Sequence, residues 1–195
     1  LMELLRPGQV FFDVGANVGV YTLLGAKTVG PTGAVVAFEP LPRNLAFLFR
    51  HLRLNRARNV TIAPLACADR VATELFYEGA NPALGRLATV EQAGRRSGAT
   101  LVATVTLDAA AEHLRLQPDV LKIDVEGAEL RVLEGAKTLL EQARPAILLS
   151  IHSDQLRQSC LSFLENHNYT VTPLDAETLG QANEYLATPR PAQNN

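Results

Sequence analysis

Apolar runs of strand length recur along the chain, separated by stretches in which apolar residues follow a helical period. We predict strands at residues 10–14, 34–38, 60–64, 120–125, 146–151, 169–172 and 185–187. Strands that alternate with helices are typical of βαβ units and of a parallel sheet, whose strands are apolar on both faces. The pattern therefore predicts an α/β fold with a mostly parallel sheet and helices on both faces.

The helices between these strands are predicted from apolar positions three and four residues apart. The first is expected to begin near Val18, and the second to end at Asn55. A third is predicted at residues 128–142, before Pro145, and a fourth at 155–165. Two apolar stripes are expected to face the sheet: Leu45, Leu48, Phe49 and Leu52 in the second helix, and Val132, Leu133, Ala136, Leu139 and Leu140 in the third.

The segment from about Thr73 to Thr106 breaks this rhythm, because short apolar pieces alternate there with glycines and a proline. Such a segment favours a hairpin or flap. The chain has 195 residues, which fits one domain of ordinary size. We therefore expect a single domain over residues 1–195, with a loose tail at 189–195.

Composition and charge narrow the classes of partner. The formal net charge of −2 gives no general attraction to phosphate backbones, so a nucleic-acid partner is not expected. The longest apolar runs are far shorter than the roughly 18 residues of a membrane span, and the start of the chain shows no signal-peptide pattern. Cys67 and Cys160 have no spacing typical of a disulfide framework or a zinc site. A cytoplasmic location is expected, and the oligomeric state stays open.

The first candidate site is the turn between the strand at 10–14 and the next helix. Gly15 permits a tight turn, and Gly19 permits close helix packing or a close approach of ligand, because neither has a Cβ. Glu39 follows Gly19 by 20 residues at the end of the next strand, where a carboxylate can accept hydrogen bonds from both ribose hydroxyls. An adenosine is therefore the expected ligand, and a turn that binds nothing is the alternative.

Asn17 occupies the place of the middle glycine in a dinucleotide fingerprint, the glycine that lets the backbone reach a pyrophosphate. This difference argues against a diphosphate and leaves room for a nucleoside with an amino-acid tail. Backbone N–H groups at the helix start would meet the carboxylate of that tail, and Asp13 could meet its amino group.

The second candidate site is the charged end of the strand at 120–125. Alternation along a strand places Lys122, Asp124 and Glu126 on one face, at the sheet edge where open α/β proteins bind ligands. His152 ends the following strand and could face the same crevice. The alternative is structural: Lys122 and Asp124 would form a buried ion pair, and Glu126 would sit at a helix N-terminus.

Together these segments resemble the FkbM family of methyltransferases that use S-adenosylmethionine (SAM). The resemblance covers about residues 10–152. It rests on four ordered motifs: Phe-Asp-Val-Gly-Ala-Asn-Val-Gly at 12–19, Ala-Phe-Glu-Pro at 37–40, Thr-Leu-Asp at 106–108, and Lys-Ile-Asp-Val-Glu-Gly-Ala-Glu at 122–129 with Val-Leu-Glu-Gly-Ala at 132–136.

The resemblance implies a Rossmann-like class I methyltransferase fold with a seven-stranded sheet, SAM as cofactor, and O-methylation of a sugar or natural-product hydroxyl. A small molecule or glycan would be the acceptor. Asp124 and Glu126 would line the reaction crevice. The first two motifs would hold SAM through Asp13, Gly15, Ala16, Asn17, Gly19, Glu39 and Pro40.

The chain departs from the family at Ser150, where the family commonly has a glutamate before the histidine at 152. An acid–base or metal role of that glutamate therefore cannot be transferred. Asp124 or His152 is the expected base, with Lys122 and Glu126 beside them. A divalent ion bound by Asp124, Glu126 and His152 is the alternative means of activating a hydroxyl. Rival functions are an NAD-dependent oxidoreductase and a non-catalytic SAM-binding domain.

Overall fold

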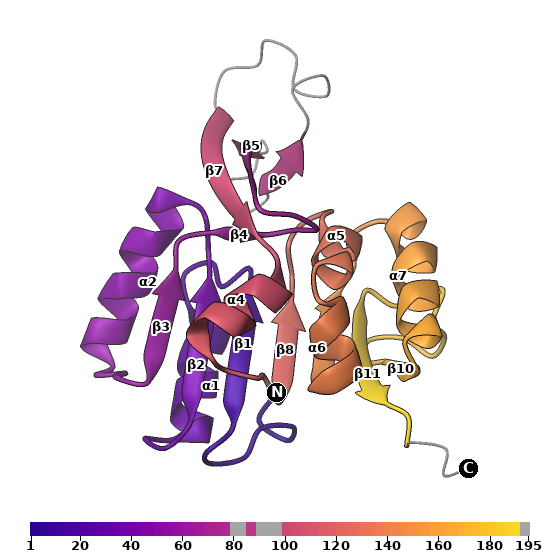
Figure 1. Cartoon of the computed structure of the whole chain (residues 1–195), viewed down its shortest axis with the longest axis horizontal. Coiled ribbons are helices and arrows are strands. Elements are labelled where there is room, and N and C mark those ends of the chain that lie inside the picture. The colour runs from indigo at the N-terminus through magenta and orange to yellow at the C-terminus, as the bar shows by residue number, and fades with distance from the viewer. Residues whose placement is uncertain (79–84, 89–98, 192–195) are drawn as a thin grey trace.

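The computed structural model describes residues 1–78, 85–88 and 99–191 (Figure 1). Its main layer is a seven-stranded sheet in the order β10-β11-β9-β8-β1-β2-β3. Neighbouring strands are parallel except at β11, which runs antiparallel to both β9 and β10. The strands are β1 (Val10–Val14), β2 (Ala34–Phe38), β3 (Val60–Ala63), β8 (Val120–Ile123), β9 (Ala146–Ser150), β10 (Tyr169–Pro173) and β11 (Glu184–Pro189). The predicted α/β class and mostly parallel sheet are confirmed.

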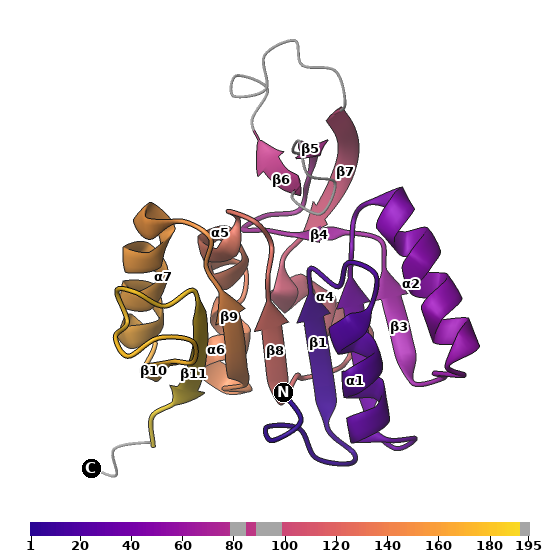
Figure 2. The ribbon, with the colours of Figure 1, turned by 180° about the vertical axis from the view of Figure 1, so that it is seen from behind.

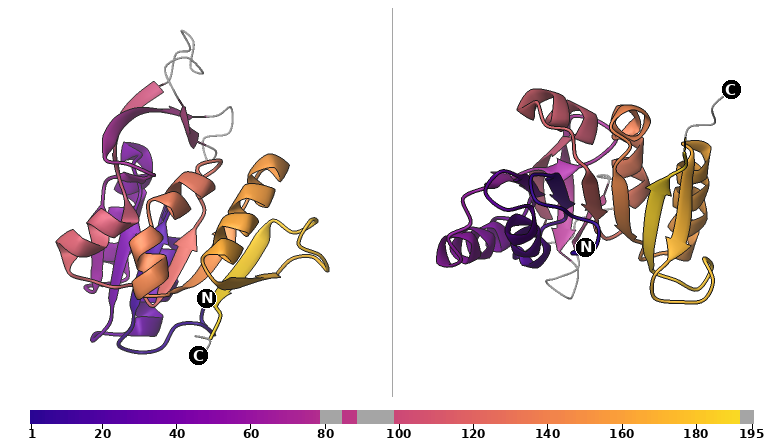
Figure 3. Two further views of the ribbon diagram at one scale, coloured as in Figure 1. Left: turned by 45° about the vertical axis from the view of Figure 1, so that its right-hand side comes forward. Right: turned by 90° about the horizontal axis from the view of Figure 1, so that it is seen from below.

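Helices cover both faces of the sheet, as predicted (Figures 1 and 2). One face carries α1 (Val20–Val29) and α2 (Pro42–Leu54). The other carries α4 (Leu107–Leu114), α5 (Glu129–Glu134), α6 (Lys137–Gln142) and α7 (Asp154–Asn166). Figure 3 shows these layers from the side and from below.

Alternation along β1 separates the two halves of the core. Phe12 and Val14 belong to the large apolar cluster under α4–α7, whereas Phe11 packs with Ala26 and Val29 of α1 on the opposite face. All of these side chains are buried. Among the described residues, no helix combines the length and apolar character that a membrane crossing requires.

A second, smaller sheet lies beyond the carboxyl ends of the parallel strands (Figure 1). Its order is β4-β7-β5-β6, and β5 is antiparallel to both of its neighbours. The strands are β4 (Ala66–Cys67), β5 (Ala72–Glu78), β6 (Gly85–Ala88) and β7 (Ala99–Val105). The predicted hairpin or flap at 73–106 is found in β5, β6 and β7, while residues 79–84 and 89–98 of that segment lie outside the described residues.

The helix predicted at 128–142 is interrupted at Gly135 and forms α5 and α6. A Cβ on Gly135 would lie 2.1 Å from the Ala68 carbonyl oxygen, so the small sheet is packed directly on this junction. Asp108 stabilises the new helix start, because its carboxylate accepts hydrogen bonds from the N–H groups of Thr138 and Leu139, both at 2.9 Å. The apolar stripe predicted for this segment is buried throughout.

Other predictions differ from the structure in detail. In the stripe predicted for α2, Leu48 and Leu52 are buried as expected, but Phe49 is 59% exposed, and the remaining buried residue of the helix is Asn44. The strand predicted at 120–125 ends at Ile123, and no pattern predicted α4 or β4.

The C-terminal tail begins later than predicted. Pro189 pairs with Tyr169 in the sheet, and the Arg190 N–H donates to the Asn168 carbonyl at 2.8 Å. The predicted loose tail is therefore wrong for these two residues, and residues 192–195 lie outside the described part of the chain.

The contact at Gly135 predicts a large cost for a single methyl group. Gly135→Ala should lower the free energy of unfolding by about 1–3 kcal/mol, because the added Cβ meets backbone that cannot rotate away. Gly180→Ala is the matched control: a Cβ there meets nothing within 4 Å, and the change should stay within about 0.5 kcal/mol. Urea unfolding of both variants measures this, and equal midpoints would contradict the tight contact.

Candidate active site

A pocket opens at the carboxyl ends of β1, β2 and β8, beneath the small sheet. Six of its lining residues were predicted from the sequence: Gly15, Asn17, Glu39, Pro40, Asp124 and Glu126. The two candidate sites are therefore parts of one pocket. Its other walls include Asn44 of α2, Cys67 of β4 and Phe76 of β5, which sequence reasoning missed. Burial raises the pKa of the Cys67 thiol, so this side chain acts as an apolar wall and not as a nucleophile.

The turn after β1 is held in an unusual backbone conformation. Gly15, Asn17 and Gly19 all have positive φ angles, of 79°, 51° and 94°. A Cβ on Gly15 would lie 1.9 Å from the Asp124 carbonyl oxygen, so only glycine allows this approach. The N–H groups of Gly15 and Ala16 donate to the Phe38 carbonyl at 3.1 and 2.9 Å. This turn is consequently fixed to the ends of both β2 and β8.

Ala16 and Gly19 contribute to the turn without lining the pocket. Ala16 is 4% exposed, and a Cβ on Gly19 would lie 2.5 Å from Leu48 Cδ1. Gly19 therefore serves the close packing of the turn on α2. This is one of the two roles that the sequence allowed.

Glu39 lies at the end of β2 with its carboxylate in a ring of donors. Oε1 accepts from the Leu41 N–H at 2.9 Å and from Asn44 Nδ2 at 3.2 Å, and Oε2 accepts from the Asn17 N–H at 2.9 Å. A carboxylate has about four lone-pair sites, so Oε2 keeps capacity for one more donor. Burial raises the pKa of Glu39, and the hydrogen bonds to its carboxylate oppose this effect.

Asp13 and Lys122 form a buried ionic group behind the pocket. Asp13 is fully buried, and its Oδ2 accepts from Thr22 Oγ1 at 2.5 Å. Lys122 Nζ lies 3.5 Å from Asp13 Oδ1, 3.4 Å from Asp124 Oδ2 and 3.2 Å from the Gly15 carbonyl oxygen. Burial raises the pKa of Asp13 despite the neighbouring ammonium. The structure thus places Asp13 against Lys122 and not on the pocket surface. It also shows the ion pair of Lys122 with Asp124 that the alternative interpretation of the second candidate site predicts.

Asp124 and Glu126 line the pocket and both contact His152, which does not itself line it. His152 Nε2 lies 3.0 Å from Asp124 Oδ1 and 3.7 Å from Glu126 Oε1, with all three side chains about one-third exposed. The hydrogen bond to Asp124 and the charge of Glu126 raise the pKa of His152 to about 9. Burial alone would raise the pKa of Asp124, but the hydrogen bond from His152 and the charge of Lys122 outweigh it and lower this pKa.

Glu126 reaches this group by a route that the alternation argument did not foresee. Because β8 ends at Ile123, residues 124–127 form a turn in which Glu126 has a φ of 47° and Gly127 a φ of 97°. Burial raises the pKa of Glu126. Asp124, Glu126 and His152 offer ligand atoms within 4.8 Å of one another, which is close enough for one divalent cation.

A carboxylate that the sequence did not reveal lies beside Ser150. Glu184 of β11 stands opposite Ser150 in the antiparallel register, and its Oε2 accepts from Ser150 Oγ at 2.9 Å. Burial raises the pKa of Glu184, and the negative charge of Asp124 contributes to this shift. Ser150, where the resemblance implies a glutamate, is therefore next to an acid from the neighbouring strand.

The model of the methyltransferase FkbM domain matches residues 13–171. The chain belongs to the FkbM family of methyltransferases. It is 30% identical over 86% of its length to 31-O-demethyl-FK506 methyltransferase FkbM of Streptomyces tacrolimicus, 75% of which it spans. It is also 28% identical over 78% of its length to the hexuronic acid methyltransferase AglP of Haloferax volcanii, 60% of which it spans.

Solved structures share the fold of this FkbM domain. A methyltransferase FkbM from Methylobacillus flagellatus KT superposes with a TM-score of 0.62 at 20% identity, covering 95% of this chain and 48% of that chain. The fibrillarin of Aeropyrum pernix, solved with S-adenosyl-L-methionine bound, gives a TM-score of 0.59 at 13% identity over 94% of this chain and 67% of that chain. The class I fold expected from the resemblance is confirmed. The chain is a SAM-dependent methyltransferase, so the rival function of an NAD-dependent oxidoreductase is excluded.

Proposed function

We propose that this domain transfers the methyl group of SAM to a hydroxyl oxygen of a small molecule, such as a sugar or a natural product. The observation that carries the proposal is the contact of His152 with Asp124, a residue that lines the same pocket as Glu39. The relatives named for O-demethyl-FK506 and for hexuronic acid support this class of acceptor.

The residues present fit SAM as cofactor. Bound SAM supplies an electrophilic methyl group on a sulfonium centre. The free lone pair on Glu39 Oε2 suits a ribose hydroxyl, and the glycine turn offers backbone close to the pocket. Asp13 is committed to Thr22 and Lys122, so we propose that it stabilises the turn and does not contact the cofactor.

The base is the second requirement, because a sugar or alkyl hydroxyl is a poor nucleophile until its proton leaves. We propose that His152 accepts this proton and that Asp124 orients the ring and stabilises its charged form. Lys122 acts as a positioning residue, since its ammonium holds Asp124 Oδ2 while the other oxygen faces His152. A divalent cation between Asp124, Glu126 and His152 is the alternative.

The charge at the mouth favours a small-molecule acceptor over a nucleic acid. Asp124, Glu126 and Glu184 place three carboxylates around His152, and such a surface disfavours a phosphate backbone. The net charge of −2 points the same way.

The proposal predicts an O-methylated product that depends on Asp124. Purified protein is incubated with SAM and a panel of sugars, uronic acids and macrolide alcohols, and products are identified by mass spectrometry and NMR. Asp124→Asn should reduce turnover by at least about 100-fold, because His152 loses its orienting partner, while calorimetry still detects SAM binding.

Asp154→Asn is the matched control. Asp154 is an acid at the start of α7, and its side chain is 92% exposed. Its turnover should equal that of the unmodified protein. A methyl group found only on nitrogen or carbon, or normal turnover in Asp124→Asn, would contradict the proposed reaction.

The proposed base also predicts a pH dependence. Asp124 and Glu126 contact His152, and the charges of Glu129 and Glu184 also act on it; its pKa is raised to about 9, so the imidazole is protonated and inactive as a base at neutral pH. As pH rises toward 9 the neutral fraction of His152 grows, so kcat/KM should increase about tenfold per pH unit and then level off.

The profile should be the same after dialysis against EDTA. A flat profile above pH 6 would assign the proton to Asp124, and activity lost in EDTA but restored by Mg²⁺ would support the cation.

A further inference from the structure

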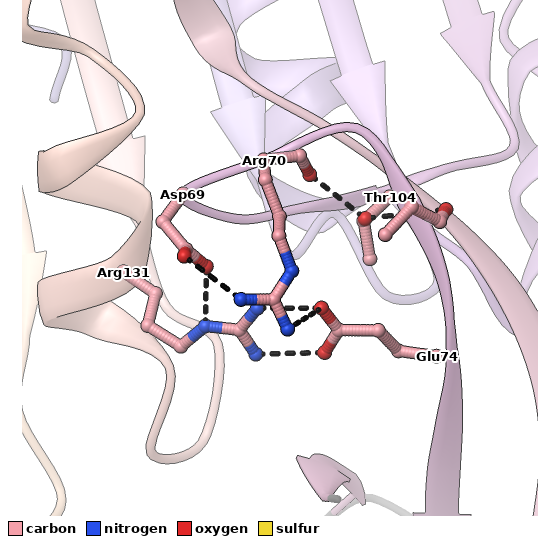
Figure 4. A network of polar contacts seen from close by, with 6 residues as sticks. Asp69, Arg70, Glu74, Thr104 and Arg131 are labelled. Atoms are coloured by element: carbon pink, nitrogen blue, oxygen red, sulfur yellow. Dashed lines mark hydrogen bonds and ion pairs between the residues drawn. The ribbon is translucent and has the colours of Figure 1, made fainter.

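An ionic network joins the small sheet to α5 (Figure 4). Arg131 of α5 makes a bidentate contact with Glu74 of β5, with Nη1 at 2.8 Å from Oε2 and Nη2 at 2.6 Å from Oε1. Its Nε lies 2.6 Å from Oδ1 of Asp69, in the loop between β4 and β5. The guanidinium of Arg131 thus uses all three of its nitrogens to contact β5 and the loop before it.

Burial distinguishes this contact from an ordinary surface ion pair. The side chain of Glu74 is 12% exposed and that of Arg131 is 29% exposed, whereas Arg70 in the same network is 62% exposed. Bidentate, partly buried arginine–carboxylate pairs fix geometry better than exposed pairs, which contribute little. The hydrogen bonds from Arg131 also lower the pKa of Glu74, so this carboxylate stays ionised across the neutral range.

The network joins the side chain of Glu74 in β5 to a helix of the main fold. Within the described residues, β5 pairs only with β6 and β7 and has no backbone pairing to the seven-stranded sheet. The base of the small sheet is held separately, by the contact of Ala68 with Gly135. Arg131 therefore adds a side-chain contact to the main fold to the backbone pairing that β5 makes within the small sheet.

Glu74 and Phe76 are two residues apart on β5, so they lie on the same face of the strand. Phe76 is half-buried and forms a wall of the pocket that Gly15, Glu39 and Asp124 also line. Arg131 is the third residue of α5, the helix that follows the turn containing Asp124 and Glu126. The ion pair between Arg131 and Glu74 consequently connects the helix that follows Asp124 and Glu126 with the strand that carries Phe76.

We propose that Arg131 is a positioning residue for the cofactor: through its bidentate contact with Glu74 it sets the place of Phe76 against the pocket. The inference takes the pocket as the SAM site, and it is independent of which acceptor is methylated and of which group is the base. Arg131 itself does not line the pocket, so its effect on the cofactor must pass through β5.

The test measures the Kd of S-adenosylhomocysteine by calorimetry for variants of the whole chain. Phe76→Ala should raise the Kd about tenfold, as expected for loss of one aromatic contact to a nucleobase. Arg131→Gln should raise it by a similar factor, with KM for SAM rising and kcat little changed. The double variant should bind no more weakly than Phe76→Ala alone, because both changes remove the same contact.

Three controls separate positioning from general stability. Arg70→Gln removes an exposed member of the same network whose ion pairs, among the described residues, are with Asp69 and Glu74 and not with α5, and it should leave the Kd unchanged. Arg131→Lys should restore binding only in part, because an ammonium cannot make the bidentate contact. Glu74→Gln should repeat the effect of Arg131→Gln and provides a second variant if that one unfolds early, as judged by its Tm.

Two results would overturn the inference. The first is an unchanged Kd in Arg131→Gln or Glu74→Gln with a lowered Tm, which would leave the network a purely stabilising contact. The second is a double variant in which the two factors multiply. Absence of any S-adenosylhomocysteine binding by the unmodified protein would instead contradict the cofactor assignment.

Discussion

The turn after β1 lies directly against the backbone at the end of β8, and the active pocket depends on this contact. A side chain on Gly15 would overlap the Asp124 carbonyl, so the approach requires glycine. Lys122 reinforces it from below, since its ammonium reaches Asp13, Asp124 and the Gly15 carbonyl at once. A buried cation between two carboxylates is costly to separate, because removing one partner leaves an uncompensated charge. The turn that we propose for the nucleoside and the segment that we propose for the reacting groups are thereby kept in one geometry.

The same contact explains why local sequence signals were informative here. Gly15, Asn17 and Glu39 belong to segments adjacent in the chain, and parallel strands bring their carboxyl ends to one edge of the sheet. Asp124 follows the strand paired with β1, so its place beside Gly15 also follows from the topology. The roles were harder to assign than the places. The sequence predicts both Asp13 and Lys122 at the site, and the structure adds that both are buried and form an ion pair behind the pocket lining.

Features that depend on long-range pairing could not be predicted from sequence. Glu184 reaches Ser150 only because β11 inserts antiparallel between β9 and β10, and no local pattern encodes that insertion. The interruption of the helix at Gly135 reflects the Ala68 backbone, 67 residues away in the chain. From the sequence, Arg131 is an ordinary residue on a helix surface. Its role follows only from the contacts with Asp69 and Glu74, which the small sheet places beside it. Each of these features is a contact between distant segments, whereas periodicity reports only on neighbours.

The most direct measurement is a crystal structure of the chain with S-adenosylhomocysteine bound. The ribose should lie within hydrogen-bonding distance of Glu39 Oε2, the sulfur should face Asp124 and His152, and Phe76 should contact the nucleoside. An adenosine bound outside the pocket between Gly15 and Glu39, or a sulfur directed away from Asp124, would contradict the assignment of cofactor and reacting groups to one site.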